Sequence, residues 1–476
     1  MFEFSLFSLT LLSVLLSFVG NENNRLRALI AGQAAAFFSS IGLAVTVFTG
    51  LAQSQTQSGL PGLVMVDSAS AMVSVLVSFI GLITLVFSER YMLGEKSRLS
   101  FCRLLVLMAL TAQLTALSNH MILSLLAYGA ISVLLYLFMN LRAESRKLAV
   151  SVLKYHLLAD FFLAFAFATL YFDGGPLHFS RLKDFHVNSS LFNLGAYLLV
   201  LSLCIKSALF PFHRWLLNTL NCPTPLSGLM HAGVVNIAGV MACKVYPALQ
   251  LVPGSLYVWG ALALVSAMVG TLTMSTQFDV KRKLVYSTVG QMGFMSLQCA
   301  CGLVPAAVFH LIAHGLFKCH MFLQSGSSVN EGLIKKEFAA IKKDDAALSP
   351  LAVSLVFVTL AFVIFYAFGT QAVASTLALA ASVPILLTMP AFSRVSAPVA
   401  LALAAATALL VFTSVSLAVS FEHALSMVSF SSPAFWLLPL AFVFFLVFHF
   451  LVNTAGKGKN RLADWLYVQA LSGFYV

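Results

Sequence analysis

The stretch CIKSALFPFHRWLLNTLNCPTPLSGLMHAGVVNIAG, residues 204–239, places ionisable side chains within otherwise apolar sequence. Lys206 ends the apolar run LGAYLLVLSLCI, and His231 begins another. A lysine at the bilayer centre costs about 2.5–3.5 kcal/mol and usually faces a bundle interior or a water-filled cavity. Lys206 is therefore a candidate functional residue, although a lysine near a helix end can also extend its ammonium group to the membrane surface.

The composition indicates a membrane protein. Of the 476 residues, 60% are hydrophobic and 9% are charged, which excludes a soluble globular class. The first twenty residues lack a basic n-region and a cleavage site, so we expect a retained helix and not a signal peptide. We predict an all-α polytopic membrane bundle of about 13–15 transmembrane helices, with its least certain boundaries at 211–225. The apolar runs are centred near residues 12, 38, 78, 109, 129, 164, 201, 236, 264, 292, 314, 358, 382, 408 and 443.

Basic residues alternate between loops. Loops after odd-numbered runs, such as NENNRLR and NLRAESRK, are rich in arginine and lysine, and those after even-numbered runs hold almost none, except HFSRLKDFH at 178–186. This pattern places the N-terminus outside and the basic loops and the C-terminus in the cytoplasm. The net charge of +11 thus reports topology, and nucleic-acid binding is not expected.

Charge also divides the chain into three regions. Residues 1–345 form the expected transmembrane core that carries an ion pathway. Residues 346–456 are expected to form further transmembrane helices poor in charge, and 457–476 a cytoplasmic amphipathic tail.

Two prolines interrupt the second half of the opening stretch. Pro223 and Pro225 precede His231, and proline removes an amide donor and disfavours helix before it. At membrane depth such a break is tolerated where it lines a cavity or is packed in protein, which predicts a broken helix. A plain turn between helices is the alternative.

A second cluster lies in FHLIAHGLFKCHMFL, residues 309–323. His310, His314 and Lys318 recur every four residues and so share one helix face. Histidine titrates near neutrality, so the row is a possible proton wire. The alternatives are packed core histidines, or a zinc site, which is disfavoured because Leu311 stands where a metalloprotease needs glutamate.

Two further positions are candidates. Asp160 lies in YHLLADFFLAFAF, where it could stabilise a charged Lys206 or cap a helix. Lys281 lies in FDVKRKLVYSTVGQMGF, where it could carry protons or anchor the helix at the inner surface. The seven cysteines show no CxxC pairing, so we expect no metal site and no cofactor.

These motifs, in this order, resemble the proton-translocating antiporter-like family, the large membrane subunits of respiratory complex I and of multisubunit sodium/proton antiporters. The resemblance covers about 200 residues and is carried by KSALFPFHRWL, NCPTPLSGLMHAG, DVKRKLVYSTVGQMGF and FHLIAHGLFKCHMFL. It implies an antiporter-like fold. It also implies that the family's proton-pathway positions correspond to Lys206, His231, Lys281, His314 and Lys318, with His310 beside them.

The chain departs from the family pattern at two places. Gly129 stands where the family has a glutamate that pairs with the key lysine, which makes Asp160 the expected counter-charge. No lysine or glutamate occurs in LSPLAVSLVFVTLAFVIFYAFGT, residues 348–370, where the family has one in a broken helix. An incomplete relay favours downhill conduction over pumping.

HAGVVNIAG and the ending WLYVQALSGFYV resemble one branch of the family, the membrane subunits of bacterial DAB inorganic-carbon accumulation complexes. That resemblance implies a non-enzymatic, proton- or cation-conducting subunit of the cell inner membrane. It would energise CO2 hydration to bicarbonate by a DabA-like, zinc-dependent, carbonic-anhydrase-like partner on the cytoplasmic face. A sodium/proton antiporter or a complex I-type pumping subunit is the main alternative, and a membrane zinc hydrolase and an inert anchor are two others. We expect protons to pass from Lys206 by His231 to Lys281 and then to the His310, His314 and Lys318 row.

Overall fold

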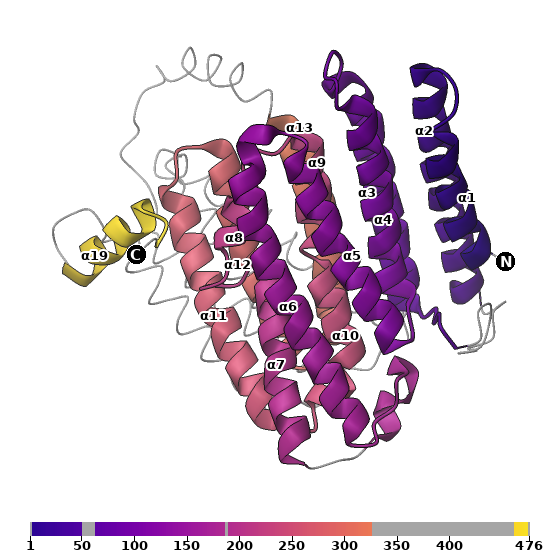
Figure 1. Cartoon of the computed structure of the whole chain (residues 1–476). Helices are drawn as coiled ribbons and strands as arrows, with labels where there is room; N and C mark the ends of the chain where they lie inside the picture. Colours follow the sequence, from indigo (N-terminus) through magenta and orange to yellow (C-terminus); the bar gives the residue numbers. More distant parts are fainter. Residues whose placement is uncertain (1, 50–61, 186–188, 326–460, 475–476) are drawn as a thin grey trace, which may run out of the picture.

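The computed structural model describes residues 2–49, 62–185, 189–325 and 461–474, and Figure 1 shows their helices as a bundle with its axes roughly aligned. Eight helical spans of the described chain are long and apolar enough to cross a membrane, and one of them, Thr224–Leu249, is interrupted. The helices are α1 (Phe2–Leu16), α2 (Glu22–Phe48), α3 (Ser68–Tyr91), α4 (Arg98–Leu117), α5 (Met121–Asn140), α6 (Arg146–Phe172), α7 (Ser190–Lys206), α8 (Arg214–Leu217), α9 (Thr224–Leu229), α10 (Ile237–Leu249), α11 (Pro253–Thr276), α12 (Val280–Ala300), α13 (Val304–Gln324) and α19 (Arg461–Leu471). Short 3-10 helices lie at Ala143–Ser145 and Phe179–Asp184, and a π-helix lies at Met230–Val234.

The predicted all-α, multi-span architecture is confirmed. Each apolar run centred between residues 12 and 314 forms a helix, and the run near 236 is divided between α9, the π-helix and α10. The described chain holds no strand beyond two isolated β-bridges that join loops. The runs centred near 358, 382, 408 and 443, and with them the expected unit 346–456, lie outside the described residues.

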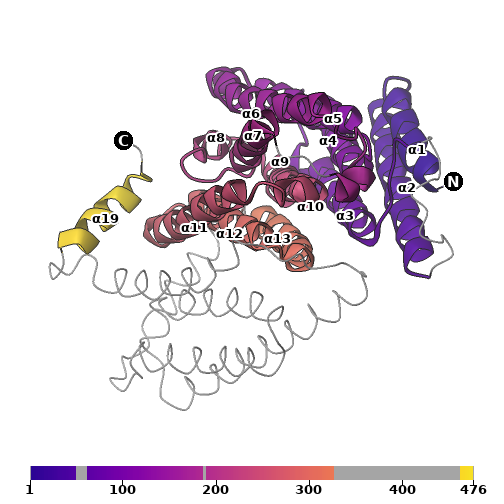
Figure 2. The ribbon, with the colours of Figure 1, turned by 90° about the horizontal axis from the view of Figure 1, so that it is seen from below.

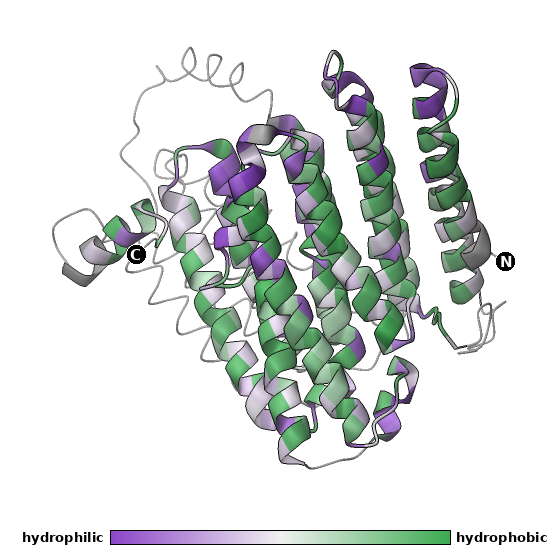
Figure 3. Ribbon diagram, in the orientation of Figure 1, coloured by the Kyte–Doolittle hydropathy of each residue, from purple (hydrophilic) through white to green (hydrophobic). Residues whose placement is uncertain are grey.

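Arginine and lysine gather at one end of the bundle, which we call the basic end. It comprises residues 20–27, 89–98, 140–147 and 277–283, around the loops α1–α2, α3–α4, α5–α6 and α11–α12. Figure 3 shows hydrophilic residues at this end, which is uppermost, and mostly apolar residues along the helices below it. These four loops therefore share one side, as the charge alternation predicts.

The interrupted helix lies at the centre of the bundle. Seen along the helices in Figure 2, α9 and α10 lie between α3–α7 on one side and α11–α13 on the other. The most apolar part of the Thr224–Leu249 span is 94% buried, against 28% for that of α6. The break is thus enclosed by the chain's own helices, as irregular backbone at membrane depth requires.

Glycines let the two helices behind this centre approach closely. A Cβ atom at Gly293 of α12 would lie 2.5 Å from the nitrogen of Ala267 and 2.7 Å from the carbonyl oxygen of Ala263, both on α11. A Cβ atom at Gly270 of α11 would overlap the backbone of Gly290 in the same way. Small residues at such contacts are typical of helix packing in membranes, where van der Waals contact drives association.

The expected amphipathic tail contains the helix α19, which lies beside α11 in Figures 1 and 2. Ala470 is fully buried and packs against Leu272 of α11. The side-chain amide of Gln277 donates to the carbonyl oxygen of Ala470 at 3.1 Å, and the hydroxyl of Tyr286 donates to that of Gly473 at 3.2 Å. The segment is therefore held against α11 and α12 near the basic end.

Candidate functional site

Lys206 is buried where three helices meet. It is the last residue of α7, which ends because Ala208 has φ +53° and Pro211 follows. Only 2% of Lys206 is exposed. Its ammonium donates to Ser132 Oγ at 2.7 Å and to the carbonyl oxygen of Tyr128 at 3.2 Å, both on α5, and forms an ion pair with Asp160 Oδ1 of α6 at 2.8 Å. The three N–H donors of the ammonium thus face three oxygens, as burial of a charged lysine requires.

Ser132 connects the two charges. Its hydroxyl accepts from Lys206 and donates to Asp160 Oδ2 at 2.6 Å. The ammonium also lies 4.2 Å from the centre of the Tyr128 ring, which contributes a cation–π contact. Lysine, serine and aspartate therefore form a triangle inside the bundle, with two hydrogen bonds through Ser132 and the ion pair as its third side.

The second group of ionisable residues begins at the helix break. His231 lies in the π-helix between α9 and α10, and its Nδ1 lies 3.1 Å from the hydroxyl oxygen of Thr288 on α12. Its ring stacks on Phe322 of α13, with the ring centroids 4.2 Å apart. The amide of Asn236 donates to the carbonyl oxygens of Ala232 in the break, at 2.8 Å, and of Leu311 on α13, at 3.3 Å, and so links the break to α13.

The row on α13 is adjacent to His231. The rings of His310 and His314 are 6.1 Å apart, and Nδ1 of His310 lies 3.0 Å from Gln298 Oε1 of α12. Lys318 is fully buried and donates to the carbonyl oxygen of Leu284, also on α12, at 3.0 Å. Thr288, the partner of His231, lies one turn beyond Leu284 on the same helix, so α12 contacts both His231 and Lys318.

Lys281 does not lie between His231 and this row, which differs from the expected order. It stands in the first turn of α12 at the basic end and is partly exposed, whereas His231 contacts Phe322 one turn past Lys318 directly. Lys281 therefore lies at the surface end of α12. Helix geometry places it one turn before Leu284, the residue that accepts from Lys318.

These buried groups occur within a region shared with known membrane proteins. Residues 118–367, more than half of the chain, match the family described as NADH:quinone oxidoreductase/Mrp antiporter, TM. The chain belongs to this antiporter family. Lys206, His231, His314 and Lys318 all lie in the matched region, as do Asp160 and Lys281.

Relatives within the antiporter family include carbon-transport subunits and subunits of oxidoreductases. The probable inorganic carbon transporter subunits DabB1 of Halothiobacillus neapolitanus and DabB of Bacillus subtilis are 38% and 37% identical over 307 and 276 residues, 62% and 55% of this chain. Each match covers 53% of the relative, so the chain spans about half the length of the curated relatives it matches. The chloroplast NAD(P)H-quinone oxidoreductase subunit 5 of Nymphaea alba is 28% identical over 281 residues, 56% of this chain and 37% of that protein.

A solved structure shows the same fold. A chain of the membrane-bound sulfane sulfur reductase, an archaeal respiratory membrane complex, superposes with a TM-score of 0.62 over 99% of this chain and 97% of its own length. The sequence identity is 16%, so this likeness concerns the fold.

Gly129, where the resemblance to the family implies a glutamate, borders the observed ion pair. A Cβ atom built at Gly129 would lie 3.9 Å from Asp160 Oδ2. Asp160 therefore places its carboxylate beside Gly129, and pairs with Lys206 from the neighbouring helix.

Sequence patterns missed several polar residues of the site. Ser132 and Tyr128 lie within the run LLAYGAISVLLYLF and were not singled out, nor were Thr288 and Gln298. His156, one turn before Asp160, is also buried and was missed. A polar residue one turn from a recognised charge, on the same helix face, is the signal that would have found His156. Ser132 and Tyr128 carry no such signal, because α5 contains no charged residue.

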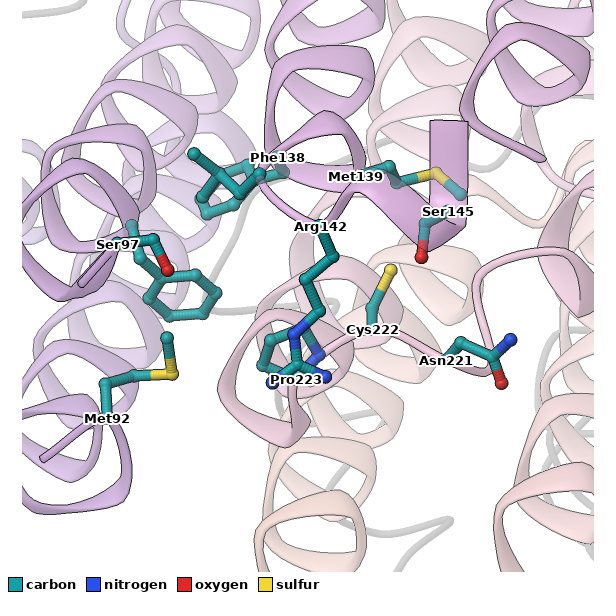
Figure 4. A pocket seen from close by; sticks show the side chains of 11 residues that line it. Met92, Ser97, Phe138, Met139, Arg142, Ser145, Asn221, Cys222 and Pro223 are labelled. Carbon is teal, nitrogen blue, oxygen red and sulfur yellow. The ribbon is translucent and has the colours of Figure 1, made fainter. Parts of the chain in front are cut away.

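A small pocket lies at the basic end of the bundle. Figure 4 shows Arg142, Ser145, Asn221, Cys222 and Pro223 around it, from the α5–α6 loop and the loop before α9. Burial raises the pKa of the Cys222 thiol to about 12, against the opposing effect of nearby Lys281 and Arg142, so this thiol stays protonated and unreactive at neutral pH.

No group of three metal-ligating side chains occurs in the part of the chain that the structure describes. The buried histidines instead lie beside a threonine, a glutamine or aromatic rings.

Proposed function

We propose that this chain is the proton-conducting membrane subunit of a DabB-type complex. It passes protons down their gradient and so energises a DabA-like partner that hydrates CO2 to bicarbonate. The names of the carbon-transport relatives support the role in bicarbonate accumulation, and the buried ionisable groups support the role in proton conduction.

The chemistry of the groups along the proposed route favours the proton over sodium as the conducted ion. Sodium needs a cage of oxygen ligands, as hard cations do. Here, however, the groups of the proposed route are the buried Lys206, Lys318, His231 and His314 with the half-buried His310 beside them, and the carboxylate of Asp160 is held by Lys206. Amine and imidazole nitrogens bind and release protons, so this set suits proton transfer better than sodium coordination.

The proposed route has two parts. The first is the Lys206–Ser132–Asp160 triangle, and the second runs from His231 along the α13 row past Lys318. Lys281 would serve the second part at the surface. Among the described side chains no hydrogen bond joins the two parts, so water molecules or side-chain movement would bridge them.

The partner would be a zinc-bearing subunit on the cytoplasmic face. Hydration of CO2 needs a metal that lowers the pKa of its bound water, and this chain would leave that catalysis to the partner. In the cell inner membrane, the basic end would then face the cytoplasm and the N-terminus would lie outside. Its positive loops suit an acidic partner surface.

Lys206→Ala tests the conducting role. The complex is reconstituted in liposomes with a pH-sensitive dye, and we expect proton flux to fall at least tenfold because a carrier and a buried charge are removed. Lys154→Ala, an exposed lysine of α6, is the matched control and should retain the flux. Wild-type flux in Lys206→Ala would disprove the proposed route.

A sodium/proton antiporter or complex I-type subunit is the second candidate, because the chain is also similar to an NAD(P)H-quinone oxidoreductase subunit 5. The proteins that co-purify with the chain separate the two. A zinc-containing partner supports the carbon role, and redox or antiporter subunits support the alternative. Stoichiometric zinc, or CO2 hydration, in the isolated chain would show that the chemistry belongs to this subunit.

A further inference from the structure

His156 is a buried histidine outside the proposed route. It lies on α6 with 1% exposed, one helical turn before Asp160 toward the basic end. Its ring meets Trp215 of α8 edge-on, with centroids 4.4 Å apart, and Trp215 Nε1 donates to the carbonyl oxygen of Ile205 at 2.7 Å. His156 thus contacts the side chain that is hydrogen-bonded to the residue before Lys206.

Both ring nitrogens of His156 lack a hydrogen-bond partner in the described chain. An unsatisfied buried polar group costs about 1–3 kcal/mol, so such groups in native proteins have a reason, such as a bound water or a chemical role. A structural histidine of a lipid-facing helix would be replaceable by an apolar side chain without this cost. The position therefore points to use of the imidazole itself.

Polar groups continue from His156 toward the basic end along the seam between α6 and α8. Asn218, which follows α8, donates from its amide to Ser151 Oγ of α6 at 3.3 Å. Ser145 and Asn221 then line the pocket of Figure 4 at the start of α6. Four residues of helix advance about 6 Å, which is too far for a direct hydrogen bond between successive groups. Proton transfer along this seam therefore needs water molecules between the groups.

We propose that His156 exchanges protons between the Lys206–Asp160 pair and the basic end, with the pocket at Arg142, Ser145 and Asn221 as its mouth. This inference rests on the proposed function. A neutral imidazole accepts a proton at one ring nitrogen and releases another from the second nitrogen to water. The ring is then neutral again but in its other tautomer, and rotation of the ring or proton exchange with water restores the first one. Its two distinct nitrogens thus pass a proton from one side of the ring to the other with no change in the charge of the ring.

His156→Gln in the intact complex tests the proposal, because glutamine keeps a polar side chain of similar size and cannot titrate. We expect liposome proton flux to fall at least tenfold. His320→Gln, an exposed histidine of α13, should stay within twofold of wild type. Flux within twofold in His156→Gln would overturn the proposal.

Lys206→Ala is measured in the same assay, so that failure of the proposed function can be distinguished from failure of the proposed role of His156. Loss in Lys206→Ala with wild-type flux in His156→Gln leaves the proposed function standing and removes His156 from it. Wild-type flux in both variants removes the proposed function as well.

Chemical rescue separates proton exchange from packing. Imidazole added to His156→Ala should restore part of the flux, at least threefold over the unrescued variant. Pyrazole has the same shape and is a much weaker base, so it should restore none. Equal rescue by both compounds, or by neither, would assign His156 a structural role.

Discussion

At the scale of single residues, Lys206 shows how a charge is kept inside the bundle. Taking an ammonium and a carboxylate out of water costs several kcal/mol each, and their attraction offsets this only with good geometry and further hydrogen bonds. Ser132 supplies those bonds to both Lys206 and Asp160, within 2.7 Å of each. The site therefore depends on three helices being held in register.

The ion pair predicts different outcomes for stability and for flux. Lys206→Met and Asp160→Leu alone should each lower the free energy of unfolding by about 3–5 kcal/mol, because each leaves an uncompensated buried charge. The double variant Lys206→Met/Asp160→Leu should recover most of this, since both charges are gone. Thermal unfolding in detergent measures stability, and liposome assays measure flux, which should be lost in all three variants. A double variant less stable than both single variants would contradict this account.

The charged residues of the site were predictable from sequence, and their arrangement was not. Lys206, Asp160 and Lys318 were identified because a charge inside an apolar run is costly. Ser132 and His156 were missed because serine and histidine in a helix are common and often inert. The surface position of Lys281 on α12 depends on how the helices pack, which the one-dimensional pattern does not contain.

At the scale of elements, helix ends and breaks create the polar features. The π-helix that holds His231 contains one extra residue per turn, and such turns often occur at functional sites. Lys244 of α10 donates to the carbonyl oxygens of Thr115, at 2.8 Å, and Ser118, at 2.6 Å, at the end of α4, where a cation complements the helix dipole. Pro223 and Pro225 predicted the break from the sequence, but they did not predict that it takes the form of a π-helix.

Close packing of α11 on α12 is an element-scale prediction. Gly293→Ala should destabilise the protein by about 1–3 kcal/mol, since the new methyl group would meet backbone atoms of α11 that cannot move aside. Gly228→Ala is the control, because its nearest neighbour would be 3.6 Å away, an ordinary contact. Thermal unfolding of both variants in detergent compares them. Equal stability would show that the helices do not approach as closely as the structure has them.

At the scale of the whole molecule, the positions of the helices along the chain were predictable from the sequence. Which helices pack against one another was not. The alternation of basic loops placed four loops on one side, as the structure has them. That α9 and α10 lie at the centre, between α3–α7 and α11–α13, follows from tertiary packing alone. The contacts of α19 likewise join residues far apart in the sequence, since Gln277 and Ala470 are separated by 193 positions.

The segment after Arg461 provides a test at this scale. Ending the chain after Arg461 removes the acceptors of Gln277 and Tyr286, and the ring of Phe474, whose centroid lies 6.3 Å from that of Phe210. We expect co-purification of the partner to fall several-fold, because the basic end loses the element that braces α11 and α12 there.

Ending the chain after Gly473 is the matched control, since it keeps α19 and both hydrogen bonds and removes three residues. Partner yield should then stay near that of the full chain. Thermal unfolding of the isolated subunit shows whether the longer truncation acts on the bundle or on the partner contact. If the chain ending at Arg461 retains the full amount of partner, α19 takes no part in assembly, and its packing on α11 serves this subunit alone.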